Sequence, residues 1–581
     1  MYVPYKSKLR RVWREHFPAR TQHAASVASS WSRQQRLVAW ATLILTACVV
    51  LMPNLAYPLI EPDETRYAQI AIEMNEARDW VTPTLDGRAY LDKPPLMYWL
   101  TALSFQMFGT NETAARLPSM LAALATISLT FGWGSRIVGR RSAWLGAMSL
   151  SLCGGFMLAG RFLILDSLLA FLTTTCLLSG YIAVRGKDHR PGWWMVSGVA
   201  CALGVLTKGP LAFVLCAPPF VVSGWLRADH SRTRVLHWVA FVMPMVAVCV
   251  PWYVAVAKFN PQFLDYFFWE HNYQRFMQGS NHEQPFWFYV PVVFAAMFPA
   301  SLLLPSVGVF LVSSSNRKRS LRSKDLGFLV CAAFWMLAFF SAARCKLPTY
   351  ILPALPFLCL TMGVMLDQTV FRAGSVDRIT NYLKPFPQRA TLILLASCAA
   401  VTGVNIFLND SVFLVDVLAS IVCVASCIFV VIHWNRDIAF GRLAWAGTTA
   451  VAVGVLMLVS TVLLPTISNE RSVFVETQRV AGTHPKAVIV FFGENSHGAR
   501  FHLSTQQTLA FPIECEEEFV GFAAEQDDFI LVTDDARIER TRQKLEATHR
   551  LTASPRHQHV YQATRVIRTA GSVACAEKVS R

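Results

Sequence analysis

The sequence predicts an all-α polytopic membrane protein, of about 13 transmembrane helices, that ends in a small extracytoplasmic α/β domain. Three observations support this fold class. Hydrophobic residues make up 54% of the chain, charged residues make up only 15%, and the mean hydropathy is positive, which excludes an ordinary soluble domain. Apolar runs long enough to span a membrane recur along most of the chain. Lys and Arg gather in alternate connections between these runs.

The N-terminal segment, residues 1–36, is basic and precedes the first apolar run, residues 37–59. This run has roughly the 20 residues that cross a bilayer, and it is longer than the apolar core of a signal peptide. We therefore expect an uncleaved first transmembrane helix, with its basic flank in the cytoplasm.

Twelve further apolar runs are predicted to span the membrane. Their approximate limits are 115–134, 142–159, 165–184, 193–206, 209–226, 236–257, 288–312, 326–342, 350–366, 390–407, 412–433 and 443–464. Alternate loops are basic, and they hold Arg136, Arg140 and Arg141; Arg185, Lys187 and Arg190; Arg227, Arg232 and Arg234; Arg317, Lys318, Arg319, Arg322 and Lys324; Arg372, Arg378, Lys384 and Arg389; and Arg436 and Arg442.

Lys and Arg are retained on cytoplasmic loops, so an odd number of spans places the C-terminus on the outer side. The same rule accounts for the net charge of +16 without nucleic-acid binding, which we do not expect.

The predicted transmembrane domain, residues 37–464, carries two long outer loops, 60–114 and 258–287. In the first loop, the amphipathic stretches 67–74 and 96–108 favour helices that lie along the membrane interface. Hydropathy falls after Pro465, and residues 465–581 are predicted to form the α/β domain. Its expected elements are buried strands at 487–492, 529–532 and 559–567 and a polar helix at 535–545.

The 14 cysteines show no CxxC pair, and most fall inside apolar runs. We therefore interpret most of them as small apolar residues packed between helices. Cys515 and Cys575 lie in the polar C-terminal part and could pair if that part is oxidised.

Three carboxylates stand at predicted outer ends of helices. Asp63 and Glu64 follow the first span, and Asp166 begins the fourth span in GRFLILDSLL. Each could act as a general base or orient a nucleophile, and each could instead cap a helix or lie solvated in a loop.

Cations accompany these carboxylates on the same side. Lys208 lies in the turn TKGP, and Arg344 and Lys346 lie in SAARCKLPTY. These residues suit phosphate groups, although a Lys can also extend to water from a helix end. In FFWEHNYQRF, His271 could be a metal ligand, a proton carrier or a hydrogen-bonded structural residue, beside Arg275.

Ionisable groups thus occur at five outer joints, whereas the spans between them hold few. Charges near a membrane are costly unless they are used, so this pattern predicts one pocket for an anionic substrate. The phosphate-binding candidates are Lys93, Lys208, Arg275, Arg344 and Lys346. The carboxylates suit an acceptor or a cationic sugar substituent.

Several motifs resemble the aminoarabinose transferase branch of the protein mannosyltransferase superfamily. They are DETRYA from Asp63, DW at Asp79, DKPP at Asp92, TKG at Thr207, FFWEH and QRF from Phe267, PFWFYVPV from Pro285 and KLPTYILP from Lys346. The resemblance covers nearly all of residues 37–366 and includes the spacing between motifs.

This resemblance implies a glycosyltransferase of the GT-C type in the bacterial inner membrane, with its site and C-terminal domain periplasmic. The expected partners are a sugar donor carried on undecaprenyl phosphate, a lipid acceptor and membrane lipids. In the best-known branch, 4-amino-4-deoxy-L-arabinose is moved to a lipid A phosphate, which gives resistance to polymyxin and other cationic peptides.

The resemblance and the residue pattern together assign roles to residues of this chain. Asp63 is expected to be the principal catalytic carboxylate, with Glu64 and Asp166 beside it. The expected substrate and phosphate ligands are Arg66, Tyr90, Lys93, Lys208, Arg275, Arg344, Lys346 and Tyr350.

Members of this branch can hold a divalent metal between a carboxylate before the KP of the DKPP motif and the histidine of the EH motif. These residues are Asp92 and His271 here, so the resemblance implies a zinc site. The branch commonly has Glu at the first position, and Asp92 retracts the oxygen by about one methylene. No nucleotide cofactor is expected, because no soluble segment holds a Gly-rich phosphate loop.

Three alternatives remain open. One is another polyprenyl-phosphate-sugar transferase with a different acceptor, since related enzymes of the superfamily glycosylate other lipids. A protein O-mannosyltransferase-like enzyme would share Asp63 and Glu64 but act on a peptide hydroxyl, for which Asp63 must be a true base. A transporter of lipid-linked sugars would usually place charges near the membrane midplane and show repeated halves, and this sequence shows neither.

Overall fold

The computed structural model of the 581-residue chain describes residues 5–18, 31–185, 190–227, 235–274, 283–314, 321–371, 385–409, 438–493, 499–503, 508–511, 515–533, 548–554 and 559–565, with isolated positions between these ranges. Contacts divide the chain into two compact units. The helical unit comprises Met1–Ala56 and Ala71–Leu464, and the C-terminal unit comprises Tyr57–Ile70 and Pro465–Arg581. The C-terminal unit thus includes a short stretch that the sequence analysis had assigned to the first outer loop.

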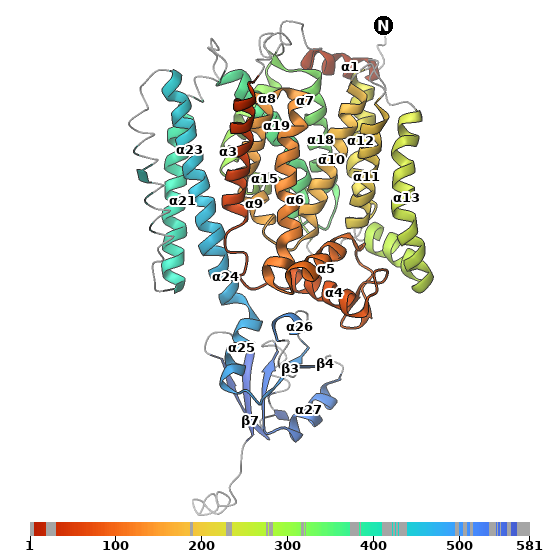
Figure 1. The fold of residues 1–581 in the computed structure, drawn as a ribbon, viewed down its shortest axis with the longest axis vertical. Helices are drawn as coiled ribbons and strands as arrows, with labels where there is room; N and C mark the ends of the chain where they lie inside the picture. Colours follow the sequence, from red (N-terminus) through yellow and green to blue (C-terminus); the bar gives the residue numbers. More distant parts are fainter. Residues whose placement is uncertain are drawn as a thin grey trace, which may run out of the picture. The chain divides into compact units, whose positions relative to one another are not determined.

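Long helices lie side by side in the helical unit (Figure 1). They are α3 (Arg33–Leu51), α6 (Glu112–Gly132), α8 (Arg140–Ser151), α10 (Leu165–Arg185), α11 (Pro191–Lys208), α12 (Leu211–Arg227), α13 (Val235–Phe259), α18 (Lys324–Ala342), α19 (Leu355–Thr369), α21 (Phe386–Asn409) and α23 (Ile438–Leu458). Shorter helical elements are α1 (Tyr5–His16), α5 (Leu96–Phe108), α7 (Gly134–Val138), α9 (Gly154–Ala159), η1 (Asp265–Gln274), α15 (Tyr289–Ala296), η2 (Ala300–Leu303), α16 (Leu304–Val312), η3 (Pro348–Ala354) and η4 (Val459–Leu463). Helix α4 (Asp63–Ala77) begins in the C-terminal unit and ends in the helical unit.

By length and composition, eight helical stretches in the described ranges could cross a membrane. They are Arg33–Leu51, Glu112–Val138, Leu165–Arg185, Val235–Phe259, Lys324–Ala342, Pro348–Thr369, Phe386–Ile406 and Arg442–Glu470. Two shorter apolar helices cover Leu211–Leu226 and Ala300–Val312. The all-α polytopic fold class is therefore confirmed, and the number of 13 spans stays a prediction.

Some predicted spans differ from the helices. The first helix ends at Leu51 rather than at residue 59, because Pro53 cannot continue the backbone hydrogen-bond ladder. The run 142–159 is divided into α8 and α9, and the run 288–312 into α15, η2 and α16. The run 412–433 lies mostly outside the described residues. The predicted interfacial helix 96–108 has the bounds of α5.

Small residues let the helix backbones of the bundle approach closely. A Cβ added to Gly146 of α8 would lie 2.8 Å from the carbonyl oxygen of Cys359 in α19. A Cβ added to Gly363 of α19 would collide with the Ser142 carbonyl and lie 2.5 Å from the Gly146 nitrogen. Such contacts between small residues replace the hydrophobic effect as the attraction between helices in lipid.

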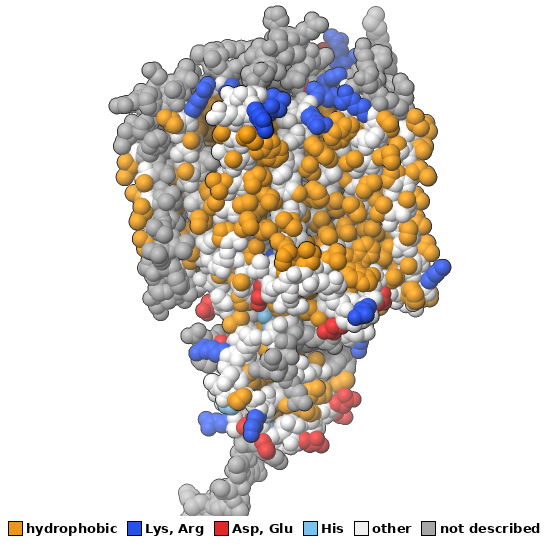
Figure 2. All heavy atoms as spheres, viewed as in Figure 1, with side chains coloured by type: hydrophobic (Ala, Val, Ile, Leu, Met, Phe, Trp, Pro, Cys, Tyr) orange, Lys and Arg blue, Asp and Glu red, His pale blue; other side chains and the backbone are white. Residues whose placement is uncertain are grey.

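One end of the helical bundle collects basic side chains (Figure 2). Arg185, in the last turn of α10, is 3.2 Å from the carboxylate of Asp325 in α18, and it donates to the carbonyl of Arg136 in α7. Arg141, at the start of α8, pairs with Asp367 of α19 at 3.0 Å. On the face of the bundle shown in Figure 2, apolar side chains predominate among the described residues between the two ends, as expected for lipid contact.

The C-terminal unit contains a five-stranded sheet with the order β4-β3-β5-β7-β6. Its strands are β3 (Val488–Phe492), β4 (Thr508–Phe511), β5 (Asp528–Val532), β6 (His549–Ala553) and β7 (Val560–Arg565). Strand β3 pairs in parallel with β4 and β5, whereas β7 pairs antiparallel with β5 and β6. Its helices are α24 (Leu464–Arg471), α25 (Val473–Thr483), α26 (Ala499–His502) and α27 (Glu516–Glu525). The predicted α/β class is confirmed here. The predicted helix 535–545 lies mostly outside the described residues, and Cys575 lies outside them.

We predict that Gly363→Ala lowers the free energy of unfolding by about 1–3 kcal/mol, because the added methyl must push α8 and α19 apart. The matched control is Gly308→Ala in α16, where a Cβ meets nothing within 4 Å. That variant should be neutral or slightly more stable, since Ala favours helix more than Gly does. Thermal unfolding midpoints measured in one detergent test the difference. Equal midpoints for the two variants would contradict the close packing of α8 and α19.

Candidate functional site

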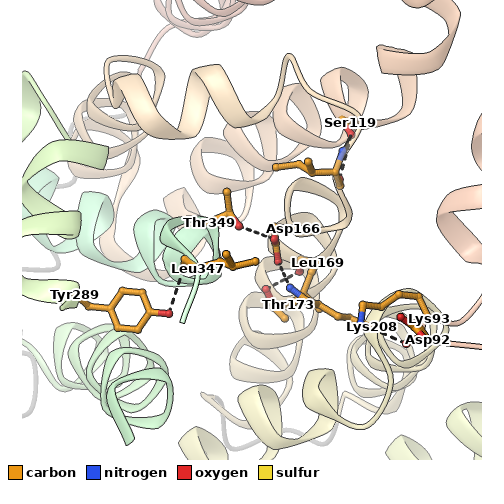
Figure 3. A network of polar contacts seen from close by, with 11 residues as sticks. Asp92, Lys93, Ser119, Asp166, Leu169, Thr173, Lys208, Tyr289, Leu347 and Thr349 are labelled. Atoms are coloured by element: carbon orange, nitrogen blue, oxygen red, sulfur yellow. Dashed lines mark hydrogen bonds and ion pairs between the residues drawn. The ribbon is translucent and has the colours of Figure 1, made fainter. Parts of the chain in front are cut away.

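Asp166 and Lys208 form a buried ion pair at the end of the bundle opposite the basic side chains described above (Figure 3). Asp166 lies in the first turn of α10, and Lys208 is the last residue of α11. The Lys208 ammonium is 2.5 Å from Asp166 Oδ1, and the two side chains are only 11% and 9% exposed. The hydroxyl of Thr349 in η3 donates to Asp166 Oδ2 at 2.7 Å. The carboxylate therefore receives a cation and a hydroxyl from two other elements of the fold.

Lys208 also contacts an aromatic face. Its ammonium lies 4.1 Å from the ring centroid of Tyr350, which is a cation–π distance. The turn that follows Lys208 depends on Gly209, whose φ of +72° suits glycine. A Cβ there would lie 2.7 Å from the ring of Phe267, so the turn and η1 are in close contact.

Lys346 is a buried cation held by backbone carbonyls. It is 3% exposed, and its ammonium donates to the carbonyl of Gln284 at 2.7 Å and to that of Ala343. Burial away from water lowers its pKa. Arg344, two residues earlier, is exposed, and its carbonyl accepts from the Gln284 nitrogen at 3.3 Å. Lys346 thus joins the chain before η3 to the chain before α15.

The loop between α4 and α5 carries Tyr90, Asp92 and Lys93. Its hairpin pairs β1 (Thr84–Leu85) with β2 (Arg88–Ala89) through Asp86-Gly87, both at positive φ as a two-residue turn requires. The carboxylate of Glu73 accepts the backbone N–H groups of Asp86 and Gly87 at 2.8 and 3.2 Å. The turn is therefore anchored to the helical unit's part of α4.

Asp92 accepts a hydrogen bond from the hydroxyl of Tyr266 in η1, at 2.5 Å. Burial raises the pKa of Tyr266, and the hydrogen bond to Asp92 raises it further. The ammonium of Lys93 donates to the Asp92 carbonyl at 3.3 Å. The ring of Tyr90 packs edge-on against Tyr98 of α5, with centroids 6.4 Å apart.

A hydrophobic cluster brings this loop to the end of α11. Leu91 packs against the cluster that contains Leu206 and Phe267, so residues close in sequence to Asp92, Lys208 and Tyr266 share one apolar core. The indole of Trp252 in α13 donates to the carbonyl of Val81 at 2.9 Å and attaches the start of the loop to α13. These contacts bring Asp92 and Lys93 to the same end of the bundle as Lys208.

Arg161, five residues before Asp166, is a structural cation. Its guanidinium is completely buried and donates to carbonyls of Val50, Leu51, Asn54 and Ser460 at 2.8–3.0 Å. Two of these carbonyls end α3, where a cation is favoured by the helix dipole. Arg161 thereby ties α3 and η4 to the segment that carries Asp166.

Asp63, Glu64 and Arg66 begin α4 within the C-terminal unit. Asp63 is exposed, and its carboxylate lies 3.5 Å from the Arg66 guanidinium one helical turn later. Glu64 is 2% exposed and accepts the Ile60 N–H at 2.8 Å. Glu64 therefore caps its own chain, as the capping interpretation anticipates, whereas Asp63 presents its carboxylate to solvent.

Two predicted residues are not described at the side-chain level. Arg275 lies outside the described residues, and of His271 only the backbone belongs to them, within η1. Among the side chains that are described, three metal-ligating groups do not gather at Asp92. Asp92 alone does not make a binding site for zinc, so the zinc site stays a prediction.

The structure adds Thr349 and Tyr266, which the sequence analysis did not select. Thr349 stands inside the KLPTYILP motif, and Tyr266 directly precedes FFWEH. Their position in or beside these motifs could have marked them as site candidates. The sequence does not show that Thr349 donates to Asp166 or Tyr266 to Asp92, because each hydrogen bond joins segments that are far apart in the chain.

Among the predicted site residues that the structure describes, this end of the bundle holds two carboxylates, Asp92 and Asp166, and four cations, Lys93, Lys208, Arg344 and Lys346. Four cations less two carboxylates leave a formal charge of +2. An excess of cations among these residues suits phosphate groups, and Lys208 is the cation whose ammonium already contacts a carboxylate oxygen, that of Asp166.

Comparison with known proteins agrees with this arrangement. The family model described as dolichyl-phosphate-mannose-protein mannosyltransferase matches residues 92–252, which include Asp92, Lys93, Asp166 and Lys208. An undecaprenyl phosphate-alpha-4-amino-4-deoxy-L-arabinose arabinosyl transferase of Pseudomonas fluorescens (strain Pf0-1) is 32% identical over 431 residues, 71% of each chain. The enzyme of the same name from Serratia proteamaculans is 33% identical over 344 residues, 57% of this chain and 60% of that one. The chain spans 60–64% of the length of three such relatives.

The fold is also similar to a solved structure. The crystal structure of ArnT from Cupriavidus metallidurans bound to undecaprenyl phosphate has a TM-score of 0.72 and 20% identity, covering 93% of this chain and 99% of that chain. This likeness establishes the fold across both units. The sequence relationship, at more than 30% identity over two thirds of the chain, establishes the family. The chain belongs to the family of undecaprenyl phosphate-α-4-amino-4-deoxy-L-arabinose arabinosyl transferases.

Proposed function

We propose that the protein is a membrane glycosyltransferase that moves 4-amino-4-deoxy-L-arabinose from undecaprenyl phosphate to a lipid A phosphate. The observation that carries the proposal is the buried Asp166–Lys208–Thr349 network. Asp166 and Lys208 belong to the stretch that matches the mannosyltransferase family model. Family membership supports the donor and the sugar. The excess of cations among these site residues supports phosphate groups on donor and acceptor.

We propose further that the basic end of the bundle faces the cytoplasm and that the Asp166–Lys208 end faces the periplasm of the inner membrane. The distribution of Lys and Arg supports this orientation, since cytoplasmic loops retain positive charge. The product would lower the negative charge of the outer surface, which is the basis of polymyxin resistance.

In the proposed reaction, an acceptor phosphate oxygen attacks the anomeric carbon of the sugar, and the bond from that carbon to the carrier phosphate oxygen breaks. The carrier phosphate leaves with the bonding electrons and gains negative charge. We assign to Lys208 the stabilisation of this negative charge, because a cation held in a site with little water stabilises developing charge strongly. Asp166 and Thr349 keep Lys208 in position before the substrate arrives.

We propose that the carboxylate of Asp63 orients either the acceptor or the amino group of the sugar. A phosphate acceptor is already anionic near neutral pH, so no proton has to be removed before attack. This differs from transfer to a peptide hydroxyl, in which a carboxylate must act as a base.

Mass spectrometry of lipid A tests the function directly. Deleting the gene in its natural host should remove the aminopentose mass increment from lipid A, and the intact chain should restore it. Unchanged lipid A together with altered protein glycans would overturn the proposal in favour of a protein O-mannosyltransferase-like activity.

A double-mutant cycle tests the role of the Asp166–Lys208 pair. Lys208→Met should lower turnover by on the order of 10²–10³-fold, because a charge-stabilising donor is lost. It should also destabilise the protein, since Asp166 is left buried with one partner fewer. Combining it with Asp166→Asn removes that charge and should restore stability but not turnover.

The matched control for this cycle is Lys258→Met, at an exposed lysine in the last turn of α13, which should change neither quantity. If the double variant regains both stability and turnover, the pair is only structural and the assignment to phosphate fails.

Replacing Asp63 by Asn tests the carboxylate of α4. We predict a fall in turnover of at least about 10²-fold, and for the unchanged protein only a shallow dependence of turnover on pH between about 6 and 8. Asp86→Asn is the control, since Asn suits the positive φ of the hairpin turn. Full turnover in the Asp63 variant would refute its role, and a steep rise with pH would favour a hydroxyl acceptor.

A further inference from the structure

Three buried thiols from three helices meet within the helical bundle. Cys176 lies in α10, Cys201 in α11 and Cys216 in α12, and their sulfur atoms all lie within 4.8 Å of one another. Each residue is at most 1% exposed. Cys201 and Cys216 follow Cys176 by 25 and 40 residues, so only the tertiary fold brings the three sulfur atoms together.

Close packing of the helices holds this cluster together. A Cβ added to Gly180 of α10 would lie 2.5 Å from the indole of Trp194 in α11 and would also collide with Phe220 of α12. A Cβ added to Gly204 of α11 would lie 2.8 Å from the side chain of Ala212 in α12. The three helices therefore approach closely on both sides of the cysteines.

Ser197 of α11 offers an oxygen to the same cluster. Its hydroxyl donates to the carbonyl of Cys176 at 2.8 Å, so its proton is directed away from the sulfur. The same oxygen lies 3.3 Å from Cys176 Sγ. The lone pairs of this oxygen therefore face the thiol. They can accept a hydrogen bond from the S–H group or coordinate a cation.

We propose that Cys176, Cys201 and Cys216 bind one soft d¹⁰ metal ion, Zn²⁺ or Cu⁺, with Ser197 as a neutral fourth donor. Sulfurs around tetrahedral zinc lie about 3.8 Å apart, because the Zn–S bond is about 2.3 Å. The observed separations, up to 4.8 Å, need only a small contraction. Thiolates select these ions over Mg²⁺ and Ca²⁺, which require oxygen ligands.

The balance of charge limits the bound state. Zn²⁺ with three thiolates carries a net charge of −1 and releases three protons on binding, whereas Cu⁺ with two thiolates and one thiol carries the same charge and releases two. Either state leaves only one net negative charge on the cluster, which limits the cost of holding it in an apolar interior.

The site stands apart from the catalytic assignment made above. Cys176 is ten residues from Asp166 along α10, and Cys201 is seven residues from Lys208 along α11. At 1.5 Å per helical residue these separations are about 15 and 10 Å. A metal here would clamp α10, α11 and α12 and so hold the helices that carry Asp166 and Lys208.

The experiment measures metal in the full-length protein. Because the thiols are buried, the chain should be loaded during synthesis, in cells supplied with Zn²⁺ or, separately, with Cu⁺-generating copper. After purification in detergent and dialysis against chelator, elemental analysis should find about one ion per chain in one of the two arms. X-ray absorption should show mainly sulfur neighbours.

Cys201→Ser and Cys201→Ala should each lower the retained metal on the order of 100-fold, because one of three thiolates is lost. The control is Cys331→Ala, a buried cysteine of α18 outside the cluster, which should retain the metal. Thermal unfolding of each variant is measured in parallel, and the unchanged protein should unfold at a lower temperature after metal-free expression.

Three results would overturn the proposal: no retained ion in either arm, equal metal in the Cys201 and Cys331 variants, or a first shell of nitrogen and oxygen atoms. The spectroscopic result comes from the unchanged protein, so a variant that fails to fold does not remove the test.

Discussion

The helical unit depends on one electrostatic constraint: a charged side chain taken out of water must find compensating groups nearby. The constraint is met in two ways. Asp166 and Lys208 compensate each other, with Thr349 as a further donor. Arg161 and Lys346 are instead surrounded by backbone carbonyls. In both cases the charged group connects segments that are far apart in sequence, so the cost of removing a charge from water is offset by contacts that define the fold.

This constraint separates the two ends of the bundle. At the basic end, Arg141 pairs with Asp367 and Arg185 pairs with Asp325. In each pair one carboxylate neutralises one guanidinium group. At the other end, the formal charge of the site residues stays positive after Asp92 and Asp166 are counted. A ligand with phosphate groups would complete the compensation of these site residues. The same physical rule therefore supports structure at one end and binding at the other.

Close helix packing supplies the precision that such a site needs. Glycines at the contacts of α8 with α19, and of α10 with α11 and α12, bring backbones together where any larger residue would collide. Helices packed in this way move little relative to one another, so Asp166 at the start of α10 and Lys208 at the end of α11 stay within hydrogen-bonding distance. The cysteine cluster lies between the same helices, and a metal there would reinforce this packing.

The sequence by itself determined the apolar helical class, the uneven distribution of basic residues and the choice of Asp166, Lys208 and Tyr350 as site candidates. Hydropathy, charge and motif spacing are local signals, readable without knowing which helices touch. Only the tertiary structure decided that Lys208 binds Asp166, that Lys346 binds the carbonyl of Gln284 and that Tyr57–Ile70 joins the C-terminal unit. These outcomes depend on contacts between segments tens to hundreds of residues apart, and one sequence carries no period or motif that reports which distant partners meet.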